Sequence, residues 1–207
     1  MKHAARPALV FILLALVSAN RPGPALAQEP RDLGSAKLVL LVRHAEKACQ
    51  PAADPERPLN LDGKKRAEEL KTVLQNVGVT AIVTSSYPRS NETARPLAAA
   101  LGILPQPVEL RSKQDIPKHI EMVVAAVRRH DGAILVVGHT ITVAGGKITI
   151  AGSPTSVTGI IEMLGGPKPD EIPETVYDRF FVLTSIGGTS RTIQLRYGAP
   201  SETPECP

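Results

Sequence analysis

Residues 38–47 have the sequence Leu-Val-Leu-Leu-Val-Arg-His-Ala-Glu-Lys, and this stretch decides the fold. Five consecutive apolar residues are typical of a strand buried on both faces, as in a parallel sheet covered by helices. Polar residues that follow such a strand lie at the carboxyl edge of the sheet, where open α/β folds bind their ligands. Arg43 and His44 therefore indicate a phosphate site with its own nucleophile. A solvated pair at a strand end would fit this stretch equally well.

The first 27 residues are expected to be a secretory signal peptide and not part of the fold. Lys2 and Arg6 form a positive start, an apolar run follows, and Ala25-Leu26-Ala27 has the small-x-small pattern of a cleavage site. The apolar run is too short to span a membrane comfortably, so a retained anchor is the weaker alternative. We expect a mature protein in the periplasm or secreted, with no attachment to a membrane.

The positive charge belongs mainly to this leader. The whole chain has a net charge of +4, and Lys2, Arg6 and Arg21 supply three of these charges with no acid to offset them, which leaves +1. The chain contains no basic run and only 3% aromatic residues. An electrostatic footprint and a stacking platform for nucleic acid are therefore both missing, and no nucleic-acid partner is expected.

The remaining length suits one domain. We expect residues 28–36 to form an N-terminal tail, residues 37–200 a single domain, and residues 201–207 a C-terminal tail. A domain of this size buries roughly 70% of its unfolded surface and does not need disulfides. Cys49 and Cys206 are the only cysteines, and in an oxidising compartment they could pair or remain two unpaired thiols.

Apolar strands alternate with amphipathic helices along the domain. This pattern predicts an α/β fold, a three-layer α/β/α sandwich with a mostly parallel sheet and a C-terminal hairpin at one edge. The predicted strands cover residues 38–42, 81–84, 107–110 and 133–137, and the hairpin strands cover 180–184 and 192–197. Four helices are predicted. The first ends before Gly78, the second runs from about 91 to 101, and the other two cover residues 116–130 and 157–164.

Polar groups follow three of these strands and could meet at one edge of the sheet. They are Arg43 and His44, the turn 85–89, and His139. Two arginines and two histidines around one point suit phosphoryl transfer. Guanidinium groups match phosphate oxygens, a neutral imidazole can attack phosphorus, and a protonated one can stabilise charge on the oxygens.

Four segments carry a resemblance to a known family. Leu41-Val42-Arg43-His44-Ala45-Glu46 resembles the Arg-His-Gly signature of the histidine phosphatase superfamily, the phosphoglycerate mutase-like branch, with Ala in place of Gly. Residues 59–67 (LNLDGKKRA), 85–94 (SSYPRSNETA) and 136–140 (VVGHT) are similar to its later motifs, and they come in the family's order.

The resemblance implies roles for individual residues. His44 would be the phosphorylated nucleophile, and Arg43, Arg89 and His139 would form the phosphate pocket around it. We also expect Glu46, Ser85 and Thr140 to contact the substrate. Glu46 either orients the loop after the first strand or is a solvated carboxylate. His119 and His130 match no motif and are predicted to be surface residues.

The sequence departs from the family at the proton donor. Many members use an acid after the third strand to protonate the leaving group. Glu109 and Asp115 lie in that region, but neither belongs to a motif that can be aligned, and Asp115 could equally be a helix cap. Small phosphohistidine phosphatases of the superfamily lack a clear acid here, which suits a leaving group that needs little protonation.

Residues 141–156 are a second departure, because in short relatives a helix follows the conserved histidine almost directly. The segment contains β-branched residues and paired glycines, which favour a small hairpin over a helix. It could be a lid that restricts substrate size or an inert surface loop.

The sequence thus predicts a phosphatase that needs no metal and no cofactor and acts through phosphohistidine on His44. Its partner would be a phosphorylated small molecule or a phosphoprotein. The alternatives are a non-catalytic phosphoryl-binding module and a phosphomutase of the same superfamily. A metal-dependent hydrolase would need clustered His and carboxylate ligands, and the sequence shows none at metal-binding spacing.

Overall fold

The computed structural model describes residues 37–49, 56–112, 115–140, 156–186 and 189–201. The predicted signal peptide and N-terminal tail, Cys206 as the possible partner of Cys49, and the segment 141–156 apart from its last residue all lie outside the described residues.

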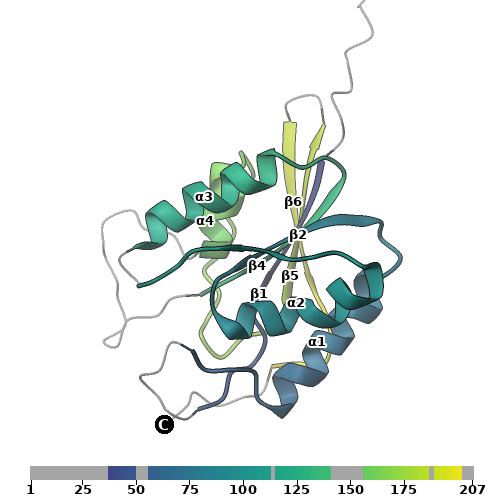
Figure 1. Ribbon diagram of the computed structural model, residues 1–207. Coiled ribbons are helices and arrows are strands. Elements are labelled where there is room, and N and C mark those ends of the chain that lie inside the picture. Colours follow the sequence, from purple (N-terminus) through teal and green to yellow (C-terminus); the bar gives the residue numbers. More distant parts are fainter. Residues whose placement is uncertain (1–36, 50–55, 113–114, 141–155, 187–188, 202–207) are drawn as a thin grey trace, which may run out of the picture. The chain divides into compact units, whose positions relative to one another are not determined.

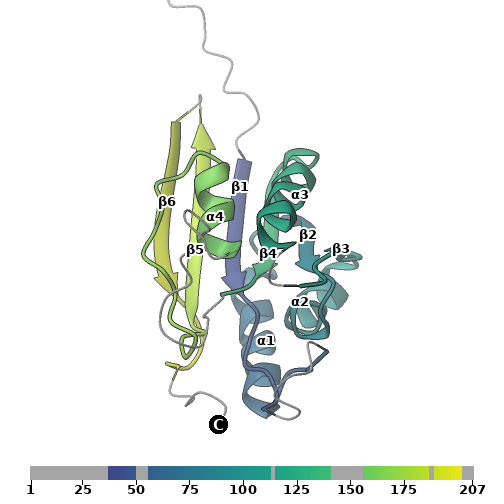
Figure 2. The same cartoon turned by 90° about the vertical axis from the view of Figure 1, so that its left-hand side faces the viewer.

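The elements in chain order are β1 (Lys37–Arg43), α1 (Leu61–Leu74), β2 (Val79–Ser85), α2 (Pro88–Leu101), β3 (Gln106–Val108), α3 (Ile116–Arg128), β4 (Ala133–Gly138), α4 (Ser156–Met163), β5 (Arg179–Ile186) and β6 (Thr189–Arg196). These six strands form one sheet, and their order across it is β3-β2-β4-β1-β5-β6, which can be followed in Figure 2. The first four in this order are parallel to one another, while β5 runs antiparallel to β1 and pairs with β6 as a hairpin. The predicted mostly parallel sheet with an edge hairpin is confirmed.

Helices cover both faces of the sheet, as Figure 1 shows, with α3 and α4 on one face and α1 and α2 on the other. Each face has its own apolar cluster. Leu41 and Val136 contribute to the cluster under α3 and α4, and Leu40 and Val137 to the one under α1 and α2. This alternation explains why the central strands are continuously apolar, since both faces are buried. The three-layer α/β/α sandwich is confirmed.

Two helix boundaries follow from local backbone chemistry. Pro88 begins α2 three residues before the predicted start, because proline has no N–H to lose in the first turn and its φ angle already suits a helix. Gly102 ends α2 in the left-handed conformation, with φ of 65°, where glycine carries no Cβ penalty.

The strand register sets the position of the site. Arg43 pairs with Gly138 across β1 and β4, so His44 and His139 follow at neighbouring strand ends. On the other side of β4, Thr84 pairs with Val137, which places Ser85 beside the same ends. Among the described residues, no helix is both long and apolar enough to cross a membrane.

Candidate active site

His44 and His139 lie side by side at the carboxyl edge of the sheet. The backbone N–H of His44 donates to the carbonyl of Gly138 at 2.9 Å, which continues the parallel ladder by one residue. The two ring centroids are 5.2 Å apart, and the rings are tilted by 58°. Both side chains are only 2% exposed. The predicted meeting of these strand ends is what the structure shows.

His44 is held as a neutral imidazole. Its Nδ1 lies 2.8 Å from the carbonyl oxygen of Ala45, an acceptor, so this nitrogen carries the ring proton and Nε2 keeps its lone pair. Burial lowers the pKa of His44 well below its ordinary value, and the charges of Arg43, His139 and Arg89 lower it further. A neutral ring with a free lone pair on Nε2 is the form that can attack phosphorus.

Arg43 is 1% exposed and points its guanidinium at uncharged partners. Its Nη1 donates to the carbonyl oxygens of Pro173 and Val176 at 3.3 and 3.2 Å and to that of Glu174. The guanidinium carbon also lies 4.0 Å from the ring centroid of Tyr177. Burial lowers the pKa of Arg43, because no water solvates its charge. Tyr177 belongs to no motif, and nothing in the sequence indicated its place here.

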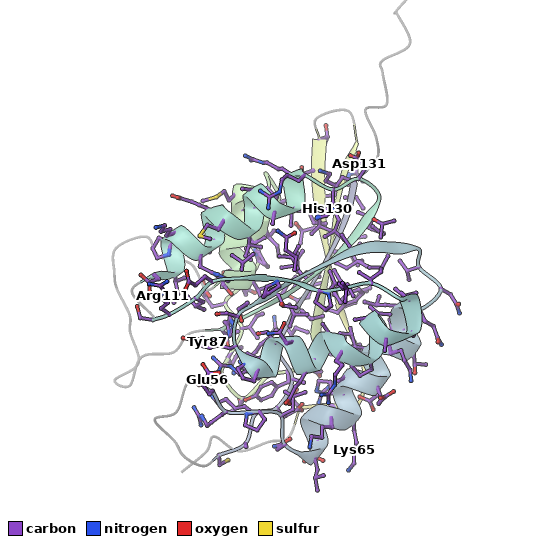
Figure 3. The ribbon with its side chains drawn as sticks, in the orientation of Figure 1. Glu56, Lys65, Tyr87, Arg111, His130 and Asp131 are labelled. Carbon is purple, nitrogen blue, oxygen red and sulfur yellow. The ribbon has the colours of Figure 1, made fainter. Side chains whose placement is uncertain are left out.

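Arg89 comes from the first turn of α2 and stacks on Tyr87, with its guanidinium carbon 4.3 Å from the ring centroid. Burial lowers the pKa of Arg89 to about 10, a direction that the nearby charges of Arg57 and Arg43 reinforce. It therefore remains charged at neutral pH. Figure 3 shows Tyr87 at the same end of the sheet as Arg111, and His130 and Asp131 at the opposite end.

His139 is fixed by three serines. Its Nε2 lies 2.6 Å from Oγ of Ser85 and 3.3 Å from Oγ of Ser90. The hydroxyl of Ser156, at the start of α4, accepts from the backbone N–H of His139 and donates to its carbonyl. Burial, followed by the charge of Arg89, lowers the pKa of His139 well below its ordinary value. Ser85 thus orients this ring, and Ser90, which the sequence analysis missed, assists it.

Glu46 is not a solvated carboxylate, because it is 2% exposed. Both of its oxygens accept hydrogen bonds from Arg66, and the shortest, from Nη2, is 2.7 Å. Helix α1 approaches the carbonyl of Glu46 so closely that a Cβ on Gly63 would lie 2.1 Å from that oxygen. Because Arg66 belongs to α1, its bonds to the Glu46 carboxylate anchor the loop after β1 to that helix.

The other predicted residues lie in different surroundings. Thr140 is 7% exposed, and its Oγ1 has no hydrogen-bond partner among the described residues, so it is available to a ligand. Glu109 is an exposed residue whose carboxylate pairs with Arg111 at 2.5 Å. Asp115 occupies the N-cap position of α3 but accepts from the hydroxyl of Ser112 instead of capping the helix.

His119 is not a surface residue, as the sequence analysis predicted, but is 1% exposed. Its ring lies 6.4 Å from that of His139, measured between centroids. The signal was present in the sequence, since residue 119 falls three positions after Ile116 and four before Val123, on the apolar stripe of α3. His130 is half-buried at the other end of that helix and contacts Gln106.

Taken together, these groups can bind a phosphoryl group. The charges of Arg43 and Arg89 both act on the two adjacent imidazoles, and guanidinium groups match the oxygens of a phosphoryl group. Within the described ranges, no three His, Cys, Asp or Glu side chains lie close enough to hold a metal ion.

A family model matches the part of the chain that carries three of the four motifs. Residues 39–115 match the histidine phosphatase superfamily (branch 1). A search of curated proteins gives no match.

Solved structures share the fold at low identity. The protein histidine phosphatase SixA complexed with tungstate is 19% identical, with a TM-score of 0.56 over 77% of this chain and 96% of that chain. Mycobacterial hydrolase 2 is 12% identical, with a TM-score of 0.53 over 83% of this chain and 94% of that one. A mycobacterial glucosyl-3-phosphoglycerate phosphatase is 13% identical, with a TM-score of 0.51 over 79% and 99% of the two chains. The resemblance to the histidine phosphatase superfamily is confirmed by the family match over residues 39–115, and the solved structures share the fold.

Proposed function

We propose that the protein is a metal-independent phosphatase that hydrolyses phosphomonoesters or phosphohistidine through a phosphohistidine intermediate on His44. The observation that carries this proposal is the neutral imidazole of His44, whose Nδ1 is bonded to the carbonyl of Ala45 and whose Nε2 keeps its lone pair. This nucleophile is buried beside the ring of His139 and beside Arg43, whose guanidinium supplies positive charge without a metal ion.

The reaction takes two steps. In the first, Nε2 of His44 attacks phosphorus, the bond from phosphorus to the leaving group breaks, and the leaving group departs with the electron pair and gains a proton. In the second, water attacks the phosphoryl group, the P–N bond breaks, and inorganic phosphate and neutral His44 remain. Arg43, Arg89 and His139 stabilise the negative charge on the non-bridging oxygens in both steps.

The test is hydrolysis of p-nitrophenyl phosphate in the presence of EDTA. We expect turnover by the unaltered protein, inhibition by vanadate, and a loss of at least about a thousandfold in kcat/KM for His44→Ala, because the nucleophile is gone. Acid-labile phosphate should be trapped on the unaltered chain and not on the variant. His130→Ala is the matched control, since it removes a histidine from the opposite end of the sheet.

Other outcomes would assign a different function. Phosphate or vanadate binding without any turnover would indicate a phosphoryl-binding module. Isomerisation of a phosphorylated substrate without release of inorganic phosphate would indicate a mutase. Activity that disappears with EDTA would contradict the proposal.

A further inference from the structure

Three buried histidines, and not two, gather at the carboxyl edge of the sheet. His119 is 1% exposed, against 2% for each of His44 and His139. It lies in the first turn of α3, and its ring is 6.4 Å from that of His139 with an angle of 62° between the planes. His139 is in turn 5.2 Å from His44, so the three rings form one contiguous group. The two-step reaction described above gives His119 no role.

One nitrogen of His119 is already engaged and the other is not. Nδ1 lies 3.1 Å from the backbone carbonyl oxygen of Glu109, so this nitrogen carries a proton. The two nitrogens of an imidazole diverge, and Nε2 is therefore directed away from the loop that follows β3. Within the described part of the chain, Nε2 has no hydrogen-bond partner and the ring has no carboxylate partner. A side chain held in this way can gain and lose a proton at Nε2 without losing its anchor.

The carboxylates predicted as proton donors are occupied elsewhere. Glu109 pairs with Arg111 and is exposed, and Asp115 accepts from Ser112. The backbone of Glu109 nevertheless holds His119, so an imidazole and not one of these carboxylates lies beside His139.

We propose that His119 exchanges the proton of the leaving-group oxygen, and that the substrate is accordingly a phosphomonoester of an aliphatic alcohol. This inference rests on the proposed function. An aliphatic alkoxide is a far poorer leaving group than a nitrophenolate or an imidazole, so it departs only if it is protonated as the bond breaks. A proton-exchanging group at this point is superfluous for phosphohistidine and necessary for an alkyl ester.

The protons balance over the two steps. In the first, Nε2–H of protonated His119 transfers its proton to the leaving oxygen as the P–O bond breaks, which releases a neutral alcohol. In the second, Nε2 takes a proton from the attacking water as its oxygen bonds to phosphorus and the P–N bond to His44 breaks. His119 ends protonated, as it began.

The substrate itself can supply the initial proton. Burial lowers the pKa of free His119. A bound phosphate monoester carries nearly two negative charges, and an opposite charge close by favours the imidazolium form. Because the second pKa of such an ester is about 6, a fraction enters at neutral pH with a proton that can move to Nε2.

The experiment compares leaving groups. His119→Asn retains an N–H at the position of Nδ1 for the carbonyl of Glu109 and removes Nε2. His130→Asn is the matched control at the far end of α3. The substrates are p-nitrophenyl phosphate, phenyl phosphate and glycerol 1-phosphate, each with the full-length chain. We expect the ratio of kcat/KM for the nitrophenyl ester to that for the glycerol ester to rise about a hundredfold in His119→Asn and to stay constant in His130→Asn.

Equal losses on all three esters would overturn the inference, since a merely structural role affects every substrate alike, and so would no loss at all. If His119→Asn does not fold, the unaltered protein decides the matter. Its kcat/KM should change little from the nitrophenyl to the glycerol ester if a proton is supplied, and a steep decline would contradict the proposal. Failure of the proposed function gives a different result, in which the unaltered protein hydrolyses none of the esters or His44→Ala retains full activity.

Discussion

Arg43 and Arg66 are both buried, at 1% and 4% exposure, yet only the charge of Arg66 is paired with a carboxylate among the described residues. Arg66 meets the carboxylate of Glu46 through Nε and Nη2, and its Nη1 donates to the carbonyl oxygens of Tyr197 and Ala199. Arg43 meets carbonyl oxygens and the ring of Tyr177, and among the described residues no carboxylate lies within ion-pair distance of it.

The pKa values move accordingly. Burial alone would lower the pKa of Arg66, but the hydrogen bonds and charge of Glu46 raise it. Burial lowers the pKa of Arg43, and its neighbours do not reverse this. A buried cation with a carboxylate partner is part of the scaffold, whereas one without such a partner is a site that an anion completes.

Breaking the compensated pair should have the largest effect on stability. Glu46→Ala leaves the guanidinium of Arg66 buried without its anion, which should lower the free energy of unfolding by about 3–5 kcal/mol. Urea denaturation measures this change. The double variant Glu46→Ala, Arg66→Met should recover most of the loss, because no charge then remains buried; a double variant as unstable as the single one would show that Glu46 acts in another way.

Removing the uncompensated cation should instead affect ligand binding. Inorganic phosphate at about a hundred times its Kd should stabilise the unaltered protein by about 2.7 kcal/mol, since it binds only the folded state. Arg43→Met should lose this stabilisation, while its stability without phosphate falls by less than that of Glu46→Ala. Thermal unfolding with and without phosphate gives both values. If phosphate stabilises Arg43→Met as much as the unaltered protein, Arg43 does not contribute to the phosphate pocket.

The smallest effect per residue should come from pH. Burial, followed by neighbouring positive charges, lowers the pKa of His44 and His139 in the folded chain. Above about pH 6.5 these histidines are neutral in both states, so their contribution to stability is complete. As the pH falls below that value the unfolded chain binds protons that the folded chain excludes, and the free energy of unfolding drops by up to about 1.4 kcal/mol per pH unit for each histidine.

Urea unfolding at several pH values between 7.5 and 5.5 measures this slope. His139→Gln should reduce it, and saturating phosphate should flatten it, because a bound anion raises the pKa of both rings. A slope that neither change alters would place the titrating groups outside the pocket.

Much of this architecture was predictable from local patterns. The apolar runs at 38–42 and 133–137 identified buried parallel strands, because only a strand covered on both faces is apolar at every position. Arg43, His44 and His139 follow those runs directly, so the register of the sheet brings them together wherever the strands pair in parallel. The turn that carries Arg89 was recognisable from its motif in the same way.

The sequence by itself therefore determined the fold class and pointed to the sheet's carboxyl edge as the candidate site, with its four candidate residues, because these depend on periodicity and on residues adjacent to strands. Only the tertiary structure decided the partners of those groups. The ring of Tyr177 stacks on the guanidinium of Arg43, and Arg66 forms an ion pair with Glu46. The ring of His119 contacts that of His139. In each pair the two residues are far apart in the sequence. Such contacts depend on how helices and loops pack across the sheet, and side chains far apart in the chain leave no local pattern that records their meeting.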